Sequence, residues 1–188
     1  MCQRMRAQPA LPELDKPVVT ELAYRPKDAD AMLTAAAYFR ALGFEEVLRR
    51  TRRTRSGAPI PQEAAALAAR EDQFDAVDAF LRSQFSRWTG CLPTEAALRA
   101  ALEAGQILCA EDGHGICGLL HFAPGRAASE LRHLAVRADC RRQGIANTLF
   151  DAYLAATGGQ KSLVWATTGN IAAEHFYETH DYRPDGWN

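Results

Sequence analysis

The sequence predicts an α/β (α+β) protein with a mixed, mainly antiparallel sheet flanked by helices. The first observation behind this prediction is the order of the expected elements in the larger, C-terminal part, which reads β-α-α-β-β-β-α-β-α. The second is size, because 188 residues with 47% hydrophobic content can bury one full core and carry a small appendage. The third is a short β-α-β pattern that precedes this series and is expected to form that appendage.

A linker divides the chain near residues 56–63, where SGAPIPQE carries two prolines and one glycine. We therefore predict an N-terminal unit over residues 1–58 and a larger domain over residues 59–188. In the N-terminal unit the expected elements are a strand, a helix and a strand, at 17–24, 28–44 and 45–55.

The larger domain begins with a short strand and two helices. Apolar residues recur at helical spacing from Phe74 to Phe85, and Thr94 is a good N-cap for a helix over 95–104. Two apolar runs then flank an Asp-Gly turn, which is typical of a β-hairpin. The expected ranges are 65–72 for the first strand and 107–110 and 116–122 for the arms of the hairpin.

The second half of this domain alternates strands and helices. A strand over Glu130–Val136 is followed by a polar turn and by a helix with an apolar face that begins at Ile145. Paired glycines end this helix, and the segment 162–168 has the composition of a strand. Asn170 can cap the last helix, over 171–180.

The polar turn, CRRQGIAN at 140–147, places charged and flexible residues directly before a helix. The first amides of a helix lack intrahelical partners and lie at the positive end of its dipole, so such a turn binds anions, phosphate above all. Gly144 removes a Cβ from the approach, and Arg141 and Arg142 add positive charge and forked donors. A solvated, arginine-rich turn is the alternative, and the spacing alone leaves both interpretations open.

The residues around this turn resemble the acyl-CoA-binding signature of the GNAT N-acetyltransferase superfamily. Its core, Arg/Gln-x-x-Gly-x-Gly/Ala, is matched by Arg141, Gly144 and Ala146. The segment NIAAEHFYETHDY resembles the last conserved helix of the family, Asn-x-x-Ala-x-x-Phe-Tyr, with matches at Asn170, Ala173, Phe176 and Tyr177. The resemblance extends from Ala65 to the C-terminus, with both motifs in the expected order.

The resemblance implies acetyl-CoA as co-substrate and direct attack by an amine, with no metal and no covalent acyl-enzyme. It places the pyrophosphate on the turn and the pantetheine arm beside the preceding strand; whether the acyl group is acetyl or longer stays open. The cofactor-binding residues that it implies are Leu134, Ala135, Val136, Arg141, Arg142, Gln143, Gly144, Ile145, Ala146, Asn170, Ala173 and Phe176.

The same resemblance indicates two catalytic residues. Tyr177 occupies the family's position for the general acid that protonates the leaving thiolate, and a packed aromatic side chain is the alternative. Glu130 precedes Gly144 by the offset that separates the glutamate base from the corresponding glycine in histone-type members. On a strand Glu130 shares a face with Arg132, Leu134 and Val136, and an ordinary exposed glutamate is the alternative.

We therefore predict N-acetyl transfer to a primary amine on a small molecule or a protein, with a catalytically silent CoA-binding module as the alternative. A formal net charge of −1 argues against nucleic-acid and membrane partners, and a homodimer stays open. The run RRTRRTR at 49–55 has no interleaved aromatic residues and is interpreted as a solvated edge strand. Five cysteines without a CxxC pair, and no signal-peptide pattern, lead us to expect a cytoplasmic protein.

The end of the chain departs from the family pattern. Only YRPDGWN, residues 182–188, follows the last helix, where the family has two more strands. Asp181 stands where the family has glycine, and aspartate tolerates the left-handed conformation better than most residues.

The N-terminal segment AAAYFRALGFEEV, at 35–47, resembles the closing motif of the chain. Tyr38 and Phe39 fall at the places of Phe176 and Tyr177. We therefore expect residues 1–58 to be the remnant of a second GNAT-like half. Its strands are expected to pack where the missing strands would be, in the same chain or in a partner chain, because an unpaired sheet edge is unfavourable.

Overall fold

The computed structural model describes residues 2–7, 19–22, 37–61, 67–86 and 91–187. The chain forms two compact units, which are described separately: unit 1 comprises Met1–Arg55 and Val164–Asn188, and unit 2 comprises Ser56–Leu163. The N-terminal segment thus shares a unit with the end of the chain. The domain boundary proposed at residue 58 stays a prediction.

Unit 2 is built on three antiparallel strands, β4 (Ile107–Asp112), β5 (Gly115–Ala123) and β6 (Ser129–Val136). β5 lies between the other two and is buried along almost its whole length, as a central strand with both faces covered should be. The predicted hairpin and the predicted strand after it are both confirmed.

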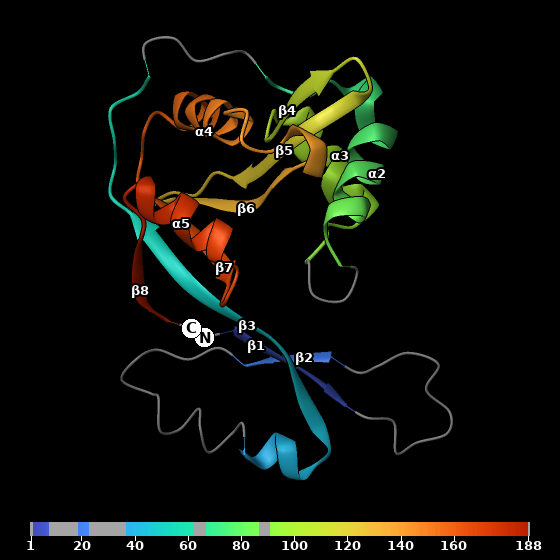
Figure 1. Ribbon diagram of the computed structural model, residues 1–188, viewed down its shortest axis with the longest axis vertical. Coiled ribbons are helices and arrows are strands. Elements are labelled where there is room, and N and C mark those ends of the chain that lie inside the picture. The colour runs from blue at the N-terminus through green and yellow to red at the C-terminus, as the bar shows by residue number, and fades with distance from the viewer. Residues whose placement is uncertain (1, 8–18, 23–36, 62–66, 87–90, 188) are drawn as a thin grey trace. The chain divides into compact units, whose positions relative to one another are not determined.

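Helices cover both faces of these strands (Figure 1). They are α2 (Phe74–Gln84), α3 (Glu95–Glu103) and α4 (Ile145–Ala156). Leu81 of α2 and Leu98 of α3 belong to one buried cluster with Leu119 of β5. On the opposite face, Tyr153 of α4 packs edge-on against Phe122, with 5.3 Å between ring centroids. Alternate residues of β5 thus face different helices, which confirms the predicted α/β class.

Unit 1 contains β1 (Cys2–Ala7), β2 (Val19–Leu22), β3 (Phe44–Arg55), most of β7 (Ser162–Thr167), α5 (Ile171–Thr179) and β8 (Arg183–Trp187). β1 pairs antiparallel with β2 and with the first part of β3, and β8 pairs antiparallel with the second part of β3. β3 also neighbours β7. The N-terminal segment therefore pairs with the closing strands of the same chain. Among the described residues, no helix has the length and apolar character needed to cross a bilayer.

Several expected elements differ in the structure. The strand predicted before α2 is, over its described part, an isolated bridge at Ala68 followed by a 3-10 helix, Glu71–Gln73. β1 was not predicted, and β8 supplies a strand where the sequence indicated hardly any. Of the helix predicted at 28–44, residues 37–41 are helical and the part before residue 37 lies outside the described residues.

The arginine-rich end of β3 is not the solvated edge strand that the sequence suggested. β3 has several neighbouring strands, and Arg53 and Arg55 are only 5% and 8% exposed. Arg53 donates a hydrogen bond to Glu178 of α5 at 3.1 Å, and the hydroxyls of Thr51 and Thr168 lie 3.1 Å apart. These arginines are therefore part of the packed structure, because the strand acquires partners that its own sequence does not reveal.

Candidate functional site

The polar turn predicted to bind an anion connects β6 to α4. The strand ends at Val136, a 3-10 turn spans Ala138–Cys140, and α4 begins at Ile145. Gly144 is the N-cap residue and has a φ of +83°, in the left-handed region that favours glycine. Arg142 also has a positive φ, +61°. Two left-handed residues thus direct the chain into the helix.

The N-terminus of α4 presents backbone donors without a side-chain cap. The amide of Thr148 donates to the carbonyl of Gly144 at 3.0 Å. The amides of Ile145, Ala146 and Asn147 precede this bond, so they have no partner within the helix. No side chain among the described residues caps this end, whereas α3 and α5 each have a side-chain cap. These donors lie at the positive end of the helix dipole, an arrangement that binds phosphate.

The space in front of Gly144 is open. A Cβ built at this position would meet no described protein atom within 4 Å, and residues 141–144 are exposed. The protein's own packing therefore requires glycine here for its φ alone, and a ligand can approach the backbone closely. Open amides flanked by two arginines are a donor set that fits the pyrophosphate of acetyl-CoA.

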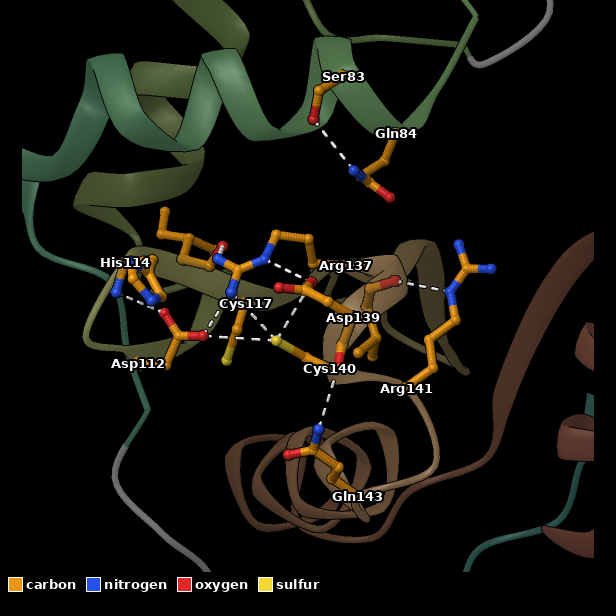
Figure 2. A network of polar contacts seen from close by, with 12 residues as sticks. Ser83, Gln84, Asp112, His114, Cys117, Arg137, Asp139, Cys140, Arg141 and Gln143 are labelled. Carbon is orange, nitrogen blue, oxygen red and sulfur yellow. Dashed lines mark hydrogen bonds and ion pairs between the residues drawn. The ribbon is translucent and has the colours of Figure 1, made fainter.

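Two side chains of the turn brace its own backbone (Figure 2). Nε of Arg141 donates to the carbonyl of Val136 at 3.0 Å, and the side-chain amide of Gln143 donates to the carbonyl of Asp139 at 3.2 Å. Arg141 was predicted as an anion ligand. In the structure, its side chain holds the turn against the end of β6.

Close packing of α4 on β5 requires Gly118. A Cβ at this position would lie 2.6 Å from Cγ2 of Ile145 and 3.0 Å from Cδ1 of Leu149. Favourable contacts between carbon atoms are about 3.5–4.0 Å long, so a side chain would push the first turn of α4 away from the strand. This residue was not predicted from the sequence, although a glycine inside a strand is a known signal of close approach by another segment.

A network centred on Arg137 lies beside the turn (Figure 2). Its guanidinium donates to the carboxylate of Asp112, to that of Asp139 at 2.7 Å, and to the sulfur of Cys140 at 3.2 Å. The backbone amide of His114 and the guanidinium lower the pKa of Asp112. Burial and the two carboxylates raise the pKa of Cys140 to about 11, so its thiol is neutral and unreactive. This network was not predicted from the sequence, because 25 positions separate Asp112 from Arg137.

β6 carries the residues predicted to contact the pantetheine arm. Leu131 and His133 are buried, whereas Glu130 and Arg132 on the other face are more exposed. The Glu130 carboxylate lies 3.4 Å from the Arg132 guanidinium, and the side-chain alternation predicted for this strand is confirmed. Residues 134–136 are half-buried at the end next to the turn.

His121 and His133 form a buried pair between β5 and β6. Their Nδ1 atoms lie 3.1 Å apart, and their rings stack with an interplanar angle of 9°. Burial, then the neighbouring His133 and Arg132, lower the pKa of His121 to about 3. His121 is therefore uncharged near neutral pH, and His133 is a buried residue that packs edge-on against Phe85.

α5 carries the second predicted motif, within unit 1. Asn170 caps this helix by accepting a hydrogen bond from the amide of Ala173 at 3.2 Å, as predicted. Tyr177 is 6% exposed. Its ring packs edge-on against Phe176 and Tyr182, with centroid distances of 5.6 Å and 5.4 Å. Tyr177 is therefore a member of a buried aromatic cluster, and its role as an acid stays a prediction.

The helical segment before β3 ends in the same way as α5. Asp181, two residues after α5, has a φ of +62°, the left-handed conformation expected at this position, and Gly43 has a φ of +84°. Phe39 packs edge-on against Phe44 at 5.2 Å, just as Tyr177 packs against the aromatic residue that follows its own turn. The N-terminal segment thus repeats the chain reversal and the aromatic contact of the closing motif, with a phenylalanine in place of the tyrosine.

The predicted site residues fall into the two units. Residues 134–136 and 141–146 lie along one strand, turn and helix of unit 2, and Glu130 lies at the opposite end of that strand. The other predicted residues, Asn170, Ala173, Phe176 and Tyr177, lie on or directly before α5 in unit 1. The structure therefore brings together the residues of the turn, and it places the predicted acid in the other unit.

The strand, turn and helix around Gly144 lie within a segment that matches a known family: the model of the acetyltransferase (GNAT) domain matches residues 103–184. This part of the chain is similar to the GNAT acetyltransferase domain. The matched segment includes β4 to α5, the whole of the turn and the aromatic cluster of Tyr177. No match was found among the curated proteins.

Solved structures of GNAT proteins share the fold at low sequence identity. A GNAT-family protein of Novosphingobium aromaticivorans is 15% identical, with a TM-score of 0.58 over 72% of this chain and 60% of that one. A GNAT-family acetyltransferase of Colwellia psychrerythraea is 16% identical, with a TM-score of 0.55 over 81% of this chain and 60% of that one. A GCN5-related N-acetyltransferase of Sphaerobacter thermophilus is 13% identical, with a TM-score of 0.57 over 87% of this chain and 55% of that one. The chain therefore spans 55–60% of the length of these structures.

Proposed function

We propose that this chain is an N-acetyltransferase that moves the acetyl group of acetyl-CoA to a primary amine. The observation that carries the proposal is the open start of α4, where three amides without helical partners follow Gly144. Arg141 and Arg142 flank these donors. Acetyl-CoA supplies the acetyl group as an activated thioester, and residues 142–146 are proposed to hold its pyrophosphate.

The strand before the turn is proposed to hold the pantetheine arm. Residues 134–136 are half-buried and lead directly into the turn, so their backbone groups are suited to an arm that extends from a pyrophosphate bound there. An amide near Val136 is proposed to donate to the thioester carbonyl. Such a donor stabilises the oxyanion that develops during amine attack, which is often the largest catalytic contribution. Asn170, directly before α5, and Ala173 and Phe176, on α5, are proposed to contribute to cofactor binding, as the family resemblance implies.

Tyr177 is proposed as the general acid. The departing thiolate must take a proton, and a tyrosine hydroxyl is a suitable donor. Edge-on contacts with Phe176 and Tyr182 fix the plane of the Tyr177 ring and thereby the direction of its hydroxyl. The support for this role is the motif match and this fixed orientation.

Glu130 is proposed as the general base that removes a proton from the acceptor amine, directly or through water. Its carboxylate is part-exposed and lies 3.4 Å from Arg132, and an exposed ion pair of this kind contributes little to stability. Glu130 is therefore available for proton transfer without loss of structure. The acceptor is proposed to be a small-molecule or protein amine.

A catalytically silent CoA-binding module is the second candidate. The observation that favours it is the burial of Tyr177, which is 6% exposed among aromatic neighbours, as a purely structural tyrosine would be. The open turn fits both candidates equally well. The difference between them therefore lies in acyl transfer and not in cofactor binding.

The decisive experiment is an assay of thiol release from acetyl-CoA across a panel of primary amines, alongside a titration of acetyl-CoA. An enzyme should release thiol only in the presence of at least one amine and should bind acetyl-CoA. A silent module should bind acetyl-CoA and release no thiol with any amine. Absence of acetyl-CoA binding would reject both candidates.

A further inference from the structure

Arg137 lies at the centre of a cluster that the proposed chemistry does not use. Asp112 ends β4, Cys117 belongs to β5 and Cys140 to the 3-10 turn, and one ligand atom of each lies within 4.8 Å of the others. This spacing would suit a metal ion. However, Nη2 of Arg137 donates to both Asp112 and Cys140, so the guanidinium itself is the cation of this cluster.

The charges that meet here are those of Arg137, Asp112 and Asp139. Burial and Asp112 raise the pKa of Cys117, and burial with both carboxylates raises that of Cys140 to about 11, so the two thiols are neutral. The guanidinium lowers the pKa of Asp139, and it adds to the His114 amide in lowering that of Asp112. Both carboxylates therefore stay ionised across the neutral range, and their ion pairs with Arg137 persist.

Arg137 ties the beginning of the turn to the neighbouring hairpin. Its backbone amide donates to the carbonyl of Cys117 at 2.8 Å, and its own carbonyl accepts from the amide of Cys140 at 3.0 Å. Its guanidinium reaches Asp112, at the end of β4, and also Asp139, two residues further along the turn. One residue placed directly after β6 thus connects the turn with both strands of the hairpin.

We propose that Arg137 and Asp112 are positioning residues for the phosphate-binding turn. The proposal rests on the proposed function, because it concerns how the same turn holds acetyl-CoA. Neither side chain needs to touch the ligand. By fixing residues 138–140, the pair fixes the direction in which the chain enters α4 and hence the orientation of the open amides. A turn that is already ordered binds an anion without the cost of ordering it during binding.

This role predicts a selective effect on ligand fragments. Acetyl-CoA carries the pyrophosphate that the turn receives, whereas S-acetylpantetheine carries the same thioester and arm without it. Loss of the Arg137–Asp112 pair should therefore weaken the binding of acetyl-CoA and leave the binding of S-acetylpantetheine unchanged. A general loss of structure would weaken the binding of both ligands.

The test is a titration of both ligands by calorimetry on the full chain, with competition against acetyl-CoA for the weaker ligand. Arg137→Gln and Asp112→Asn should each raise the dissociation constant of acetyl-CoA about tenfold, as expected for loss of one charged hydrogen bond. Arg137→Lys keeps the charge but not the forked geometry, so its effect should be smaller. Arg82→Gln is the matched control, because it removes an exposed pair with Asp78 within α2, and it should change neither constant.

Three results would overturn the proposal. The first is unchanged acetyl-CoA binding in the Asp112 and Arg137 variants. The second is equally weakened binding of acetyl-CoA and S-acetylpantetheine, and the third is a comparable loss of acetyl-CoA affinity in the Arg82→Gln control. If Arg137→Gln does not fold, Asp112→Asn and Arg137→Lys decide the question. Failure of the parent protein to bind acetyl-CoA would instead reject the proposed function, and the positioning role with it.

Discussion

Gly118→Ala tests whether the position of α4 depends on a missing side chain in β5. The added Cβ would lie 2.6 Å from Cγ2 of Ile145 and 3.0 Å from Cδ1 of Leu149. Relief of the shorter contact requires a movement of about 1 Å, because carbon atoms pack at about 3.5–4.0 Å. Cγ2 of Ile145 is a methyl on a branched Cβ with little rotamer freedom, so the helix itself must move. Overpacking of this kind typically costs about 1–3 kcal/mol.

The assay for this prediction is urea unfolding together with a titration of acetyl-CoA. Gly118→Ala should lower the free energy of unfolding by about 1–3 kcal/mol and should weaken acetyl-CoA binding, since the moved residue begins the helix that receives the ligand. Gly113→Ala is the matched control. A Cβ at that turn position meets no atom within 4 Å and φ is not positive, so both quantities should change little. Wild-type stability and binding in Gly118→Ala would show that the position of α4 does not depend on glycine at this site.

Three further predictions address the proposed acid, the proposed base and the buried histidines. Tyr177→Phe should keep acetyl-CoA binding and lower turnover by on the order of 10²-fold or more; unchanged turnover would assign the tyrosine to packing. Glu130→Gln should shift the pH–rate profile, because the variant lacks the proposed base, and a profile identical to that of the parent would exclude Glu130 as the base. The pKa of His121 falls from 6.5 to about 3 on folding, so between these values the unfolded state binds more protons. Stability should therefore fall as the pH drops through this window, by up to about 1.4 kcal/mol per unit. His121→Gln should flatten this dependence in urea unfolding, and an equally steep dependence in the variant would contradict the assignment.

Features that depend on local sequence were predictable. The cap residues Thr94 and Asn170 form the bonds expected of them, because a cap acts on amides only two or three positions away. The polar turn was found by its composition, and Asp181 adopts the left-handed conformation expected of it. In each of these cases the residues that interact are close neighbours in the chain.

Features that depend on distant partners were not predictable. The arginines of β3 were interpreted as solvated because their burial is decided by elements near the other end of the chain, such as α5, where Glu178 pairs with Arg53. Gly118 and the Arg137–Asp112 pair were missed for the same reason, since each acts on a segment that is remote in sequence. In the candidate site, the sequence predicts the turn and the residues expected to contact the cofactor. The residues that hold the turn in place are recognised only in the folded structure.

Binding of acetyl-CoA at the start of α4 can be measured through the melting temperature as a function of acetyl-CoA concentration. A ligand that binds only the folded state should raise this temperature progressively. Gly144→Glu should abolish the rise, because it places a carboxylate where the pyrophosphate is proposed to lie. Gly144→Ala controls for backbone strain at a φ of +83° and should keep a larger part of the rise. Absence of any rise in the parent protein at millimolar acetyl-CoA would show that the start of α4 does not bind this ligand.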